Sequence, residues 1–271
     1  MTCGWEQNPA AWDAATAGYC VEVAPRTAGF AADLVALLSP PPGARFLDVA
    51  CGTGVVAREA ARVGSRVVAI DFSPKMTQRA IRAAHAAGLP VTVREMDGHA
   101  LDFADSSFDY AASLFGLQFF ADRALALREM RRVLVPGGRV AIGAWAEPAR
   151  VELLAPLVRA ISAVLPDAPP APASPALFSM ADPVGMSAEL LAAGFSDVTF
   201  VEFERACTFA RPDDYWRLLV TATPGPMQRL SQLGPALKAD VRAALVDDLH
   251  ACFGDGQVVL AAIARIATGR A

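Results

Sequence analysis

Short apolar runs alternate with amphipathic stretches through the first half of the chain. Runs rich in β-forming residues occur at 46–49, 66–71, 91–96, 108–113 and 139–145. Segments whose apolar residues have helical spacing lie at 55–63, 73–87 and 122–135. Strands spaced by helices predict a parallel sheet with helices on both faces, because the crossover between parallel strands is right-handed.

The pattern loosens after Trp145. Helices are predicted at 149–164 and 184–193, and a longer helical stretch at 212–253 is interrupted at Pro224-Gly225-Pro226. The proline-rich segment 166–175 indicates a loop or a hinge. Two further runs, 198–209 and 257–266, have the character of strands and would complete the sheet.

The most informative segment joins the first strand to the first helix of this pattern. Asp48 is a carboxylate inside an apolar strand, where a charge is costly without a partner. Gly52 and Gly54 follow and allow the backbone to turn tightly and approach a ligand. Asp71 ends the second strand, 19 residues after Gly52. This layout is typical of a nucleotide-binding β-α-β unit, in which the second acid accepts from ribose hydroxyls.

Composition narrows the class of protein. The 271 residues are 54% hydrophobic and carry a net charge of −4, which disfavours a nucleic-acid partner because such partners select a basic face. The five cysteines are scattered without a CxxC pair, as expected of free thiols in a reducing cytoplasm. No segment has the pattern of a signal peptide or of a membrane span. No metal-ligand spacing occurs, so we expect no metal.

Several blocks of sequence, in order and at matching spacing, resemble class I S-adenosylmethionine-dependent methyltransferases of the ubiquinone/menaquinone-biosynthesis group. They are LDVACGTG at 47–54, AIDFSPKM at 69–76, DGHALDFADSSFD at 97–109, ALREMRRVLVPGG at 126–138 and, more weakly, LAAGF at 191–195. The family's turn usually carries one more glycine, at the position of Ala50.

The resemblance implies a fold and an organisation. The fold would be α/β, with a Rossmann-like doubly wound sheet of seven strands, mostly parallel with an antiparallel last strand, and helical cap insertions. The whole chain, 1–271, would be one methyltransferase domain. Its expected parts are an N-terminal helical lid (1–40), a cofactor-binding core (41–147), cap insertions (148–182 and 210–255) and the remaining sheet elements (183–209 and 256–271).

The resemblance also assigns residues to S-adenosylmethionine, the implied cofactor. Gly52 and Gly54, with Ala50 in the same turn, would pass beneath its amino-acid portion, and Asp48 would help to hold its ammonium group, directly or through water. The alternative for Asp48 is a structural role, in which it holds the amides of the turn. Tyr19 is implied to reach the carboxylate end of the cofactor.

The ribose and adenine have their own implied partners. Asp71 would accept both ribose hydroxyls, a bidentate task suited to a carboxylate. Ser113 would border the sulfonium. The adenine would lie among Phe72, Met76, Asp97, Gly98 and His99, with Asp97 accepting from its amino group.

Three N-terminal aromatic residues, Trp5, Trp12 and Tyr19, recur every seven residues and would share one face of a helix. This face would either pack on the sheet or form a lid whose aromatic rings close over a ligand.

The implied reaction is in-line displacement of the cofactor's methyl group by an O, N or C atom of a small-molecule acceptor. The protein mainly has to align the two reactants and exclude water. A base is needed only for a nucleophile that keeps its proton until attack, and His99 and His250 are the weak candidates. A mostly apolar wall would suit an aromatic or prenyl-like metabolite, and its candidate residues are Phe115, Gln118, Phe178, Met180, Trp216 and Met227.

Other functions remain open at this point. A protein of this fold could bind the cofactor without methylating, as a scaffold, as a regulator or as the enzyme of another reaction. The segment from Gly52 to Ala57 also fits the GxGxxA pattern of NAD-dependent dehydrogenases, with Asp71 at a suitable distance. An RNA or protein substrate is disfavoured by the acidic balance, and a homodimer is possible.

Overall fold

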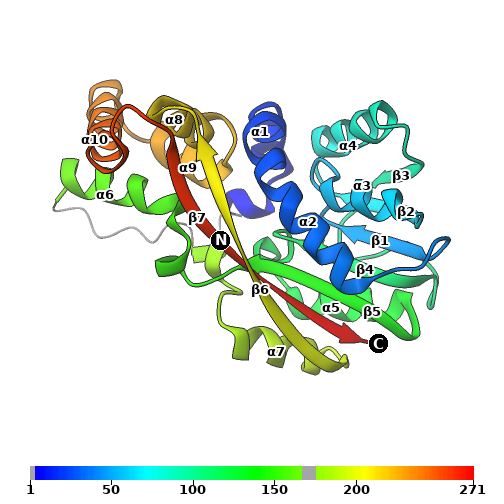
Figure 1. Cartoon of the computed structure of the whole chain (residues 1–271). Helices are drawn as coiled ribbons and strands as arrows, with labels where there is room; N and C mark the ends of the chain where they lie inside the picture. The colour runs from blue at the N-terminus through cyan, green and yellow to red at the C-terminus, as the bar shows by residue number, and fades with distance from the viewer. Residues whose placement is uncertain (1–3, 167–174) are drawn as a thin grey trace.

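A single mixed sheet forms the centre of the computed structural model, which describes residues 4–166 and 175–271 (Figure 1). The strand order is β3-β2-β1-β4-β5-β7-β6. The first five strands of the chain pair in parallel, and β7 runs antiparallel to both β5 and β6. The predicted seven-stranded Rossmann-like sheet is therefore confirmed. The strands are β1 Arg45–Val49, β2 Arg66–Asp71, β3 Val91–Glu95, β4 Phe108–Leu114, β5 Leu134–Trp145, β6 Ser196–Phe209 and β7 Val258–Arg270.

Helices cover both faces of this sheet. Figure 1 shows α2 (Ala24–Leu38), α3 (Val55–Arg62) and α4 (Pro74–Ala86) on one side, and α5 (Arg123–Val133) and α7 (Pro183–Ala192) on the other. Each layer buries its own apolar cluster against the sheet; Phe30 and Leu34 belong to the first cluster, Leu127 and Leu190 to the second. Burial of these side chains is the main force that holds the layers together.

The remaining helices gather at one end of the two long strands β6 and β7 and form a cap (Figure 1). They are α6 Ala155–Val164, α8 Pro212–Thr221, α9 Pro224–Ser231 and α10 Pro235–Phe253. The N-terminal segment lies between this cap and the core; it consists of the 3₁₀ helix η1 Trp5–Gln7, α1 Pro9–Gly18 and the π-helical turn η2 Tyr19–Val23. In the part of the chain that the structure describes, no helix combines the length and apolar character that crossing a bilayer requires.

Local sequence explains where several helices begin. The Ser73 hydroxyl accepts from the amide of Met76, and Asp122 and Asp182 cap α5 and α7 in the same way. Capping side chains of this kind satisfy amides that have no partner within the helix. The predicted helix start at Ser73-Pro74 is confirmed.

Some predicted boundaries were wrong, and each correction has a tertiary cause. β5 begins at Leu134 rather than Arg139, because Leu134 pairs with Phe108 of β4. β7 extends four residues past the predicted end at Ile266, where it follows β5 and pairs Arg270 with Arg139. Pro224 begins α9 instead of only breaking a helix. Most of the predicted proline-rich loop, 167–174, lies outside the described residues.

Candidate functional site

A cavity of about 520 Å³ opens where β1, β2 and β4 end. Parallel pairing brings these ends to the same edge of the sheet, with Val49 of β1 beside Ile70 of β2. Ligands of open α/β sheets bind at this edge. The cavity is closed from above by the N-terminal segment and from the far side by the cap helices, so three separate parts of the chain contribute to its wall.

The glycine turn after β1 forms the floor of the cavity. Ala50, Gly52 and Gly54 all have positive φ angles, of 56°, 53° and 78°. A Cβ atom on Gly52 would meet nothing within 4 Å, so the backbone here is open to a ligand. Ala50 adopts the left-handed conformation that glycine favours, at a cost of about 1–2 kcal/mol. A Cβ on Gly116 would lie 2.5 Å from that of Ala50, so the turn packs closely on the segment after β4.

The carboxylate of Asp71 connects the glycine turn after β1 to the start of α4. Its Oδ2 accepts from the amide of Gly52 at 2.8 Å, and its Oδ1 accepts from the amide of Ser73 at 2.9 Å. Each carboxylate oxygen can accept a second bond, so both remain available to a diol. Burial raises the pKa of Asp71 to about 6, although the bonds from Ser73 and Gly52 lower it.

Asp48 lies beneath the turn and is only 1% exposed. Its Oδ2 accepts from the amide of Ala57, in the first turn of α3, at 2.9 Å. Burial, with a smaller contribution from the nearby Asp71, raises the pKa of Asp48 to about 8, although the hydrogen bond from Ala57 and the charge of Arg58 lower it. Two buried carboxyl groups under one turn make a site that favours a cation.

The N-terminal segment covers this floor. Trp5, Trp12 and Tyr19 all line the cavity. The two indole rings lie 5.7 Å apart and pack edge-on against Phe119, which belongs to the 3₁₀ helix η3 Leu117–Phe119 after β4. Asp13 of α1 accepts from the Ser73 hydroxyl at 2.6 Å and from the Lys75 amide at 3.0 Å. The three aromatic residues do not share one helix as predicted, because Trp5 lies in η1, Trp12 in α1 and Tyr19 in η2, but all three line the cavity.

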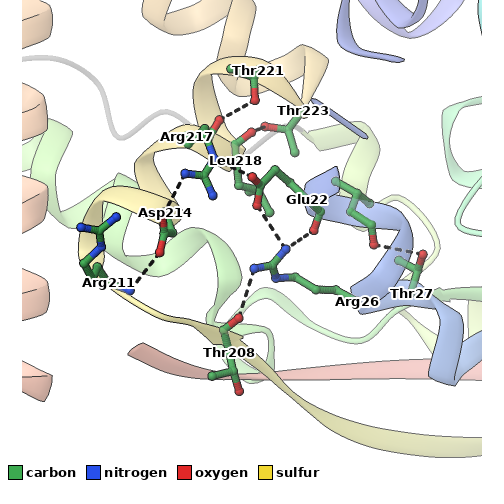
Figure 2. A network of polar contacts seen from close by, with 11 residues as sticks. Glu22, Arg26, Thr27, Thr208, Arg211, Asp214, Arg217, Leu218, Thr221 and Thr223 are labelled. Atoms are coloured by element: carbon green, nitrogen blue, oxygen red, sulfur yellow. Dashed lines mark hydrogen bonds and ion pairs between the residues drawn. The ribbon is translucent and has the colours of Figure 1, made fainter. Parts of the chain in front are cut away.

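A polar network fixes this segment to the cap (Figure 2). Glu22 of η2 is 4% exposed and accepts from Arg217 of α8 at 2.6 Å and from Arg26 of α2 at 3.3 Å. Arg217 also pairs with Asp214 at 2.9 Å, and Arg26 donates to the Thr208 carbonyl of β6 at 3.1 Å. Through Arg217 and Arg26, Glu22 thus links the N-terminal segment to the cap and to the sheet.

The predicted adenine loop lies at the edge of the cavity. Asp97 accepts from the amide of His99 at 2.9 Å, and the His99 Nδ1 lies 2.7 Å from the same oxygen. The His99 Nε2 accepts from the amide of Asp122 at 3.3 Å, and its ring packs on Phe120. Both ring nitrogens of His99 are thus engaged by its own surroundings.

The structure brings together most of the residues that the sequence assigns to the cofactor, but not all. Of the cofactor candidates, the cavity is lined by Tyr19, Asp48, Ala50, Gly52, Asp71, Phe72, Met76, Asp97, Gly98 and His99. Gly54 caps α3 instead, and Ser113 is fully buried beside the cavity, its hydroxyl without a hydrogen-bond partner among the described residues. The roles that the sequence assigns to these residues in binding the cofactor stay predictions.

The residues suggested for binding the methyl acceptor also divide into those that line the cavity and those that do not. Phe115 and Gln118 line the cavity. Phe178 and Trp216 pack against the large apolar cluster that extends from the α2 and α3 layer into the cap, and Met180 is buried in the cluster of α5 and α7. His250 is exposed near the end of α10, where its Nδ1 lies 3.1 Å from the Gly254 carbonyl oxygen. Phe178, Met180, Trp216, Met227 and His250 do not line the cavity formed by the described residues.

The sequence predicted an apolar wall, but not the residues that form most of it. We call it the cap-side wall; its residues are Val151, Leu153, Leu154, Leu157, Val158, Ile161, Leu165, Leu177, Leu218 and Ala222. A signal was present in 149–164, which carries more apolar residues than one packed helix face needs. Thr53 was also missed; it lines the cavity, and its buried hydroxyl has no partner within the described ranges.

In the described part of the chain, no group of three or more histidine, cysteine, aspartate or glutamate side chains is arranged to hold an ion.

Comparisons with known proteins agree with this geometry. Residues 47–142 match a family described as a methyltransferase domain. The chain is 40% identical over 111 residues to a demethylmenaquinone methyltransferase of Corynebacterium kroppenstedtii, covering 41% of this chain and 46% of that protein. It is 42% identical over 114 residues to a ubiquinone/menaquinone biosynthesis C-methyltransferase of Geotalea daltonii, covering 40% and 48%. The chain thus spans less than half the length of the curated relatives it matches.

A solved structure extends the likeness to the fold of most of the chain. The YcgJ protein from Bacillus subtilis superposes with a TM-score of 0.58 at 18% identity, covering 89% of this chain and 98% of that one. At this identity the likeness concerns the fold alone.

Proposed function

We propose that this chain, whose residues 47–142 form a class I S-adenosylmethionine-dependent methyltransferase domain, transfers the methyl group of that cofactor to a small apolar or aromatic acceptor. One observation carries the proposal. Two buried carboxyl groups, Asp48 and Asp71, lie under a glycine turn that is open to a cavity of about 520 Å³. The cofactor supplies an activated methyl group on a sulfonium.

The residues of the cavity fit that cofactor. Asp71 keeps free lone pairs for a ribose diol, and Asp48, when it is ionised, suits the ammonium end. Gly52 leaves space above the backbone, and the unpartnered hydroxyl of Thr53 is available to the carboxylate end. The adenine ring would lie between Met76 and the loop around Asp97.

The rest of the protein would align the acceptor and exclude water. The cap-side wall is apolar, and it faces a cavity whose roof is the aromatic N-terminal segment. Such a lining suits a ring system or a prenyl chain. Relatives named demethylmenaquinone methyltransferase make reduced quinones and naphthols the first acceptors to examine.

Among the described residues, the cap contributes no carboxylate and no imidazole to the cavity; its polar residues there are Ser162, Thr223, Gln228, Arg229 and Gln232. The acidic groups and His99 line the cavity from the sheet edge and the N-terminal segment. An acceptor with an acidic hydroxyl, or with a nucleophilic carbon, would need no dedicated base at the wall.

The same geometry disfavours an NAD-dependent dehydrogenase. A dinucleotide would bring a negatively charged pyrophosphate to the glycine turn. Here the turn lies over Asp48, and an ionised carboxylate at that point would repel the pyrophosphate. An activity measurement distinguishes a methyltransferase from a protein that binds S-adenosylmethionine without methylating.

That measurement is release of S-adenosylhomocysteine in the presence of hydroquinones, naphthols and other phenols, with mass spectrometry of the acceptor. We expect product to form with at least one apolar ring acceptor, with the acceptor gaining one CH₂ unit. Omission of the acceptor is the control, since release without it would indicate hydrolysis. Tight cofactor binding with no turnover on any acceptor would favour the non-methylating alternative.

The pKa of Asp48 makes cofactor affinity depend on pH. Because burial raises this pKa to about 8, much of the Asp48 population is protonated at neutral pH and must ionise to attract an ammonium group. Between about pH 6 and pH 8 we expect S-adenosylmethionine affinity to rise, by up to about tenfold per pH unit. Titration calorimetry of wild type and Asp48→Asn checks this.

A rise in pH has the opposite effect on the stability of the unliganded fold. A carboxyl group whose pKa is higher in the folded state binds more protons there, so the unliganded protein loses stability as pH rises from about 4 to 8. The Asp48→Asn variant should bind more weakly, with a flatter dependence on pH. An equally steep dependence in this variant would contradict the role of Asp48.

A further inference from the structure

The side chain of Gln118 is buried in the cavity wall without a partner. The residue is 2% exposed, and neither its Oε1 nor its Nε2 makes a hydrogen bond within the described residues. A buried amide in this state destabilises a fold, and such groups are rare in native proteins. A bound ligand would supply the hydrogen-bond partners that the Gln118 amide lacks.

The backbone around Gln118 is held firmly. Its carbonyl accepts from the Ser179 hydroxyl at 2.8 Å, and Leu117 before it is 1% exposed. Phe119 after it packs edge-on against the indole rings of both Trp5 and Trp12. The short helix η3 is thereby fixed both to the N-terminal segment and to the loop that leads into α7.

The position of η3 places this amide between the two halves of the site. The segment before η3 packs on the glycine turn, where Gly116 contacts Ala50. The segment it bonds to, around Ser179, directly follows Leu177 of the cap-side wall. An acceptor that lies on the cap-side wall and reaches toward the cofactor would pass this point.

We propose that Gln118 anchors the methyl acceptor by binding two adjacent polar atoms of it, one a donor and one an acceptor. A carboxamide offers Oε1 as an acceptor beside Nε2–H as a donor. The complementary group is the edge of a catechol, or an enol next to a carbonyl. The hydrocarbon body of the molecule would lie on the cap-side wall. This inference rests on the proposed function and names the substrate class for it.

Gln118 would act as a specificity-determining and positioning residue. An amide takes no proton at neutral pH, so it cannot serve as the base. Two bonds from one planar group fix the orientation of a ring in its own plane, which sets the atom that faces the methyl group. An acceptor without the donor–acceptor pair leaves the amide unsatisfied and is rejected.

The test compares two probes on protein saturated with S-adenosylhomocysteine. One probe is a naphthalene diol with its hydroxyl groups on adjacent carbons, and the other is naphthalene itself. We expect wild type to prefer the diol by about tenfold or more, the effect of one or two hydrogen bonds. Gln118→Leu should bind both probes about equally, with unchanged affinity for naphthalene and for S-adenosylhomocysteine. Exposed Gln257, outside the cavity, provides the matched control Gln257→Leu.

Thermal unfolding distinguishes this role from a structural one. Leucine removes an unpartnered amide, so Gln118→Leu should have an equal or higher Tm than wild type. Gln118→Met, with a similar shape, provides a second variant and should behave alike in both measurements. A clear fall in Tm in both variants would indicate a structural role and overturn the proposal.

Two binding results would also overturn it. One is an equal preference for the diol in wild type and Gln118→Leu, and the other is no binding of the diol to the loaded wild-type protein. Failure of S-adenosylhomocysteine itself to bind wild type is a separate result. It would remove the proposed function, and with it the premise of this inference.

Discussion

Replacing Asp71 by alanine should weaken S-adenosylmethionine binding by roughly 10²- to 10⁴-fold. The two oxygens of Asp71 each hold one loop amide and keep lone pairs for a ribose diol. Loss of two hydrogen bonds to a charged group, at about 1.5–3 kcal/mol each, gives about 3–6 kcal/mol. The substitution also leaves the amides of Gly52 and Ser73 without an acceptor, which loosens the glycine turn. Titration calorimetry of the two proteins measures the change.

The control for this experiment is Asp102→Ala. Asp102 is an exposed aspartate outside the cavity, so its loss changes the net charge equally without touching the site. The control should bind like wild type. An Asp71→Ala variant that is folded and binds as tightly as wild type would contradict the assignment of Asp71 to the ribose.

Replacing Glu22 by alanine should lower the free energy of unfolding by about 2–3 kcal/mol. Glu22 is 4% exposed and faces two arginines, and its removal leaves the guanidinium of Arg26, itself only 19% exposed, without its counter-charge. Arg217 is half exposed and contributes little to the loss. Urea unfolding of wild type and Glu22→Ala gives the difference.

The same substitution should weaken cofactor binding, because η2 carries both Glu22 and Tyr19. An exposed glutamate on β6, Glu204, provides the matched control, and Glu204→Ala should change stability by less than about 0.5 kcal/mol. If both glutamate variants were equally stable, the network of Figure 2 would not hold the N-terminal segment in place.

The cofactor half of the site was readable from the sequence because it is built locally. The turn from Asp48 to Gly54 and the acid at Asp71 lie at the ends of adjacent parallel strands, and parallel pairing brings such ends together. The pattern of strands and helices therefore predicted that Asp48, Gly52 and Asp71 would lie together at one edge of the sheet. The left-handed conformation of Ala50 is consistent with the glycine that the family usually has there.

Of the residues that the sequence suggested for the acceptor, only Phe115 and Gln118 line the cavity, because helices dock on this side through contacts far apart in sequence. The cap-side wall combines residues of α6, α8 and the segments around them, and nothing local indicates that these helices meet. Met180 and Trp216 have the composition of wall residues, yet both pack in apolar clusters. Whether the Gln118 amide finds a hydrogen-bond partner depends on its tertiary surroundings, so the sequence alone gives no sign of it. The sequence likewise gives no sign of the π-helical turn in which Tyr19 lies.

The central claim is that the cavity at the sheet edge is an S-adenosylmethionine site, and the most direct test is a calorimetric titration of the wild-type protein. S-adenosylmethionine and S-adenosylhomocysteine are titrated separately, and NAD is titrated as the competing nucleotide. The account predicts micromolar binding of both sulfur compounds, one site per chain, and no binding of NAD. Binding of NAD with no response to either sulfur compound would contradict it and return the glycine turn to the dehydrogenase hypothesis.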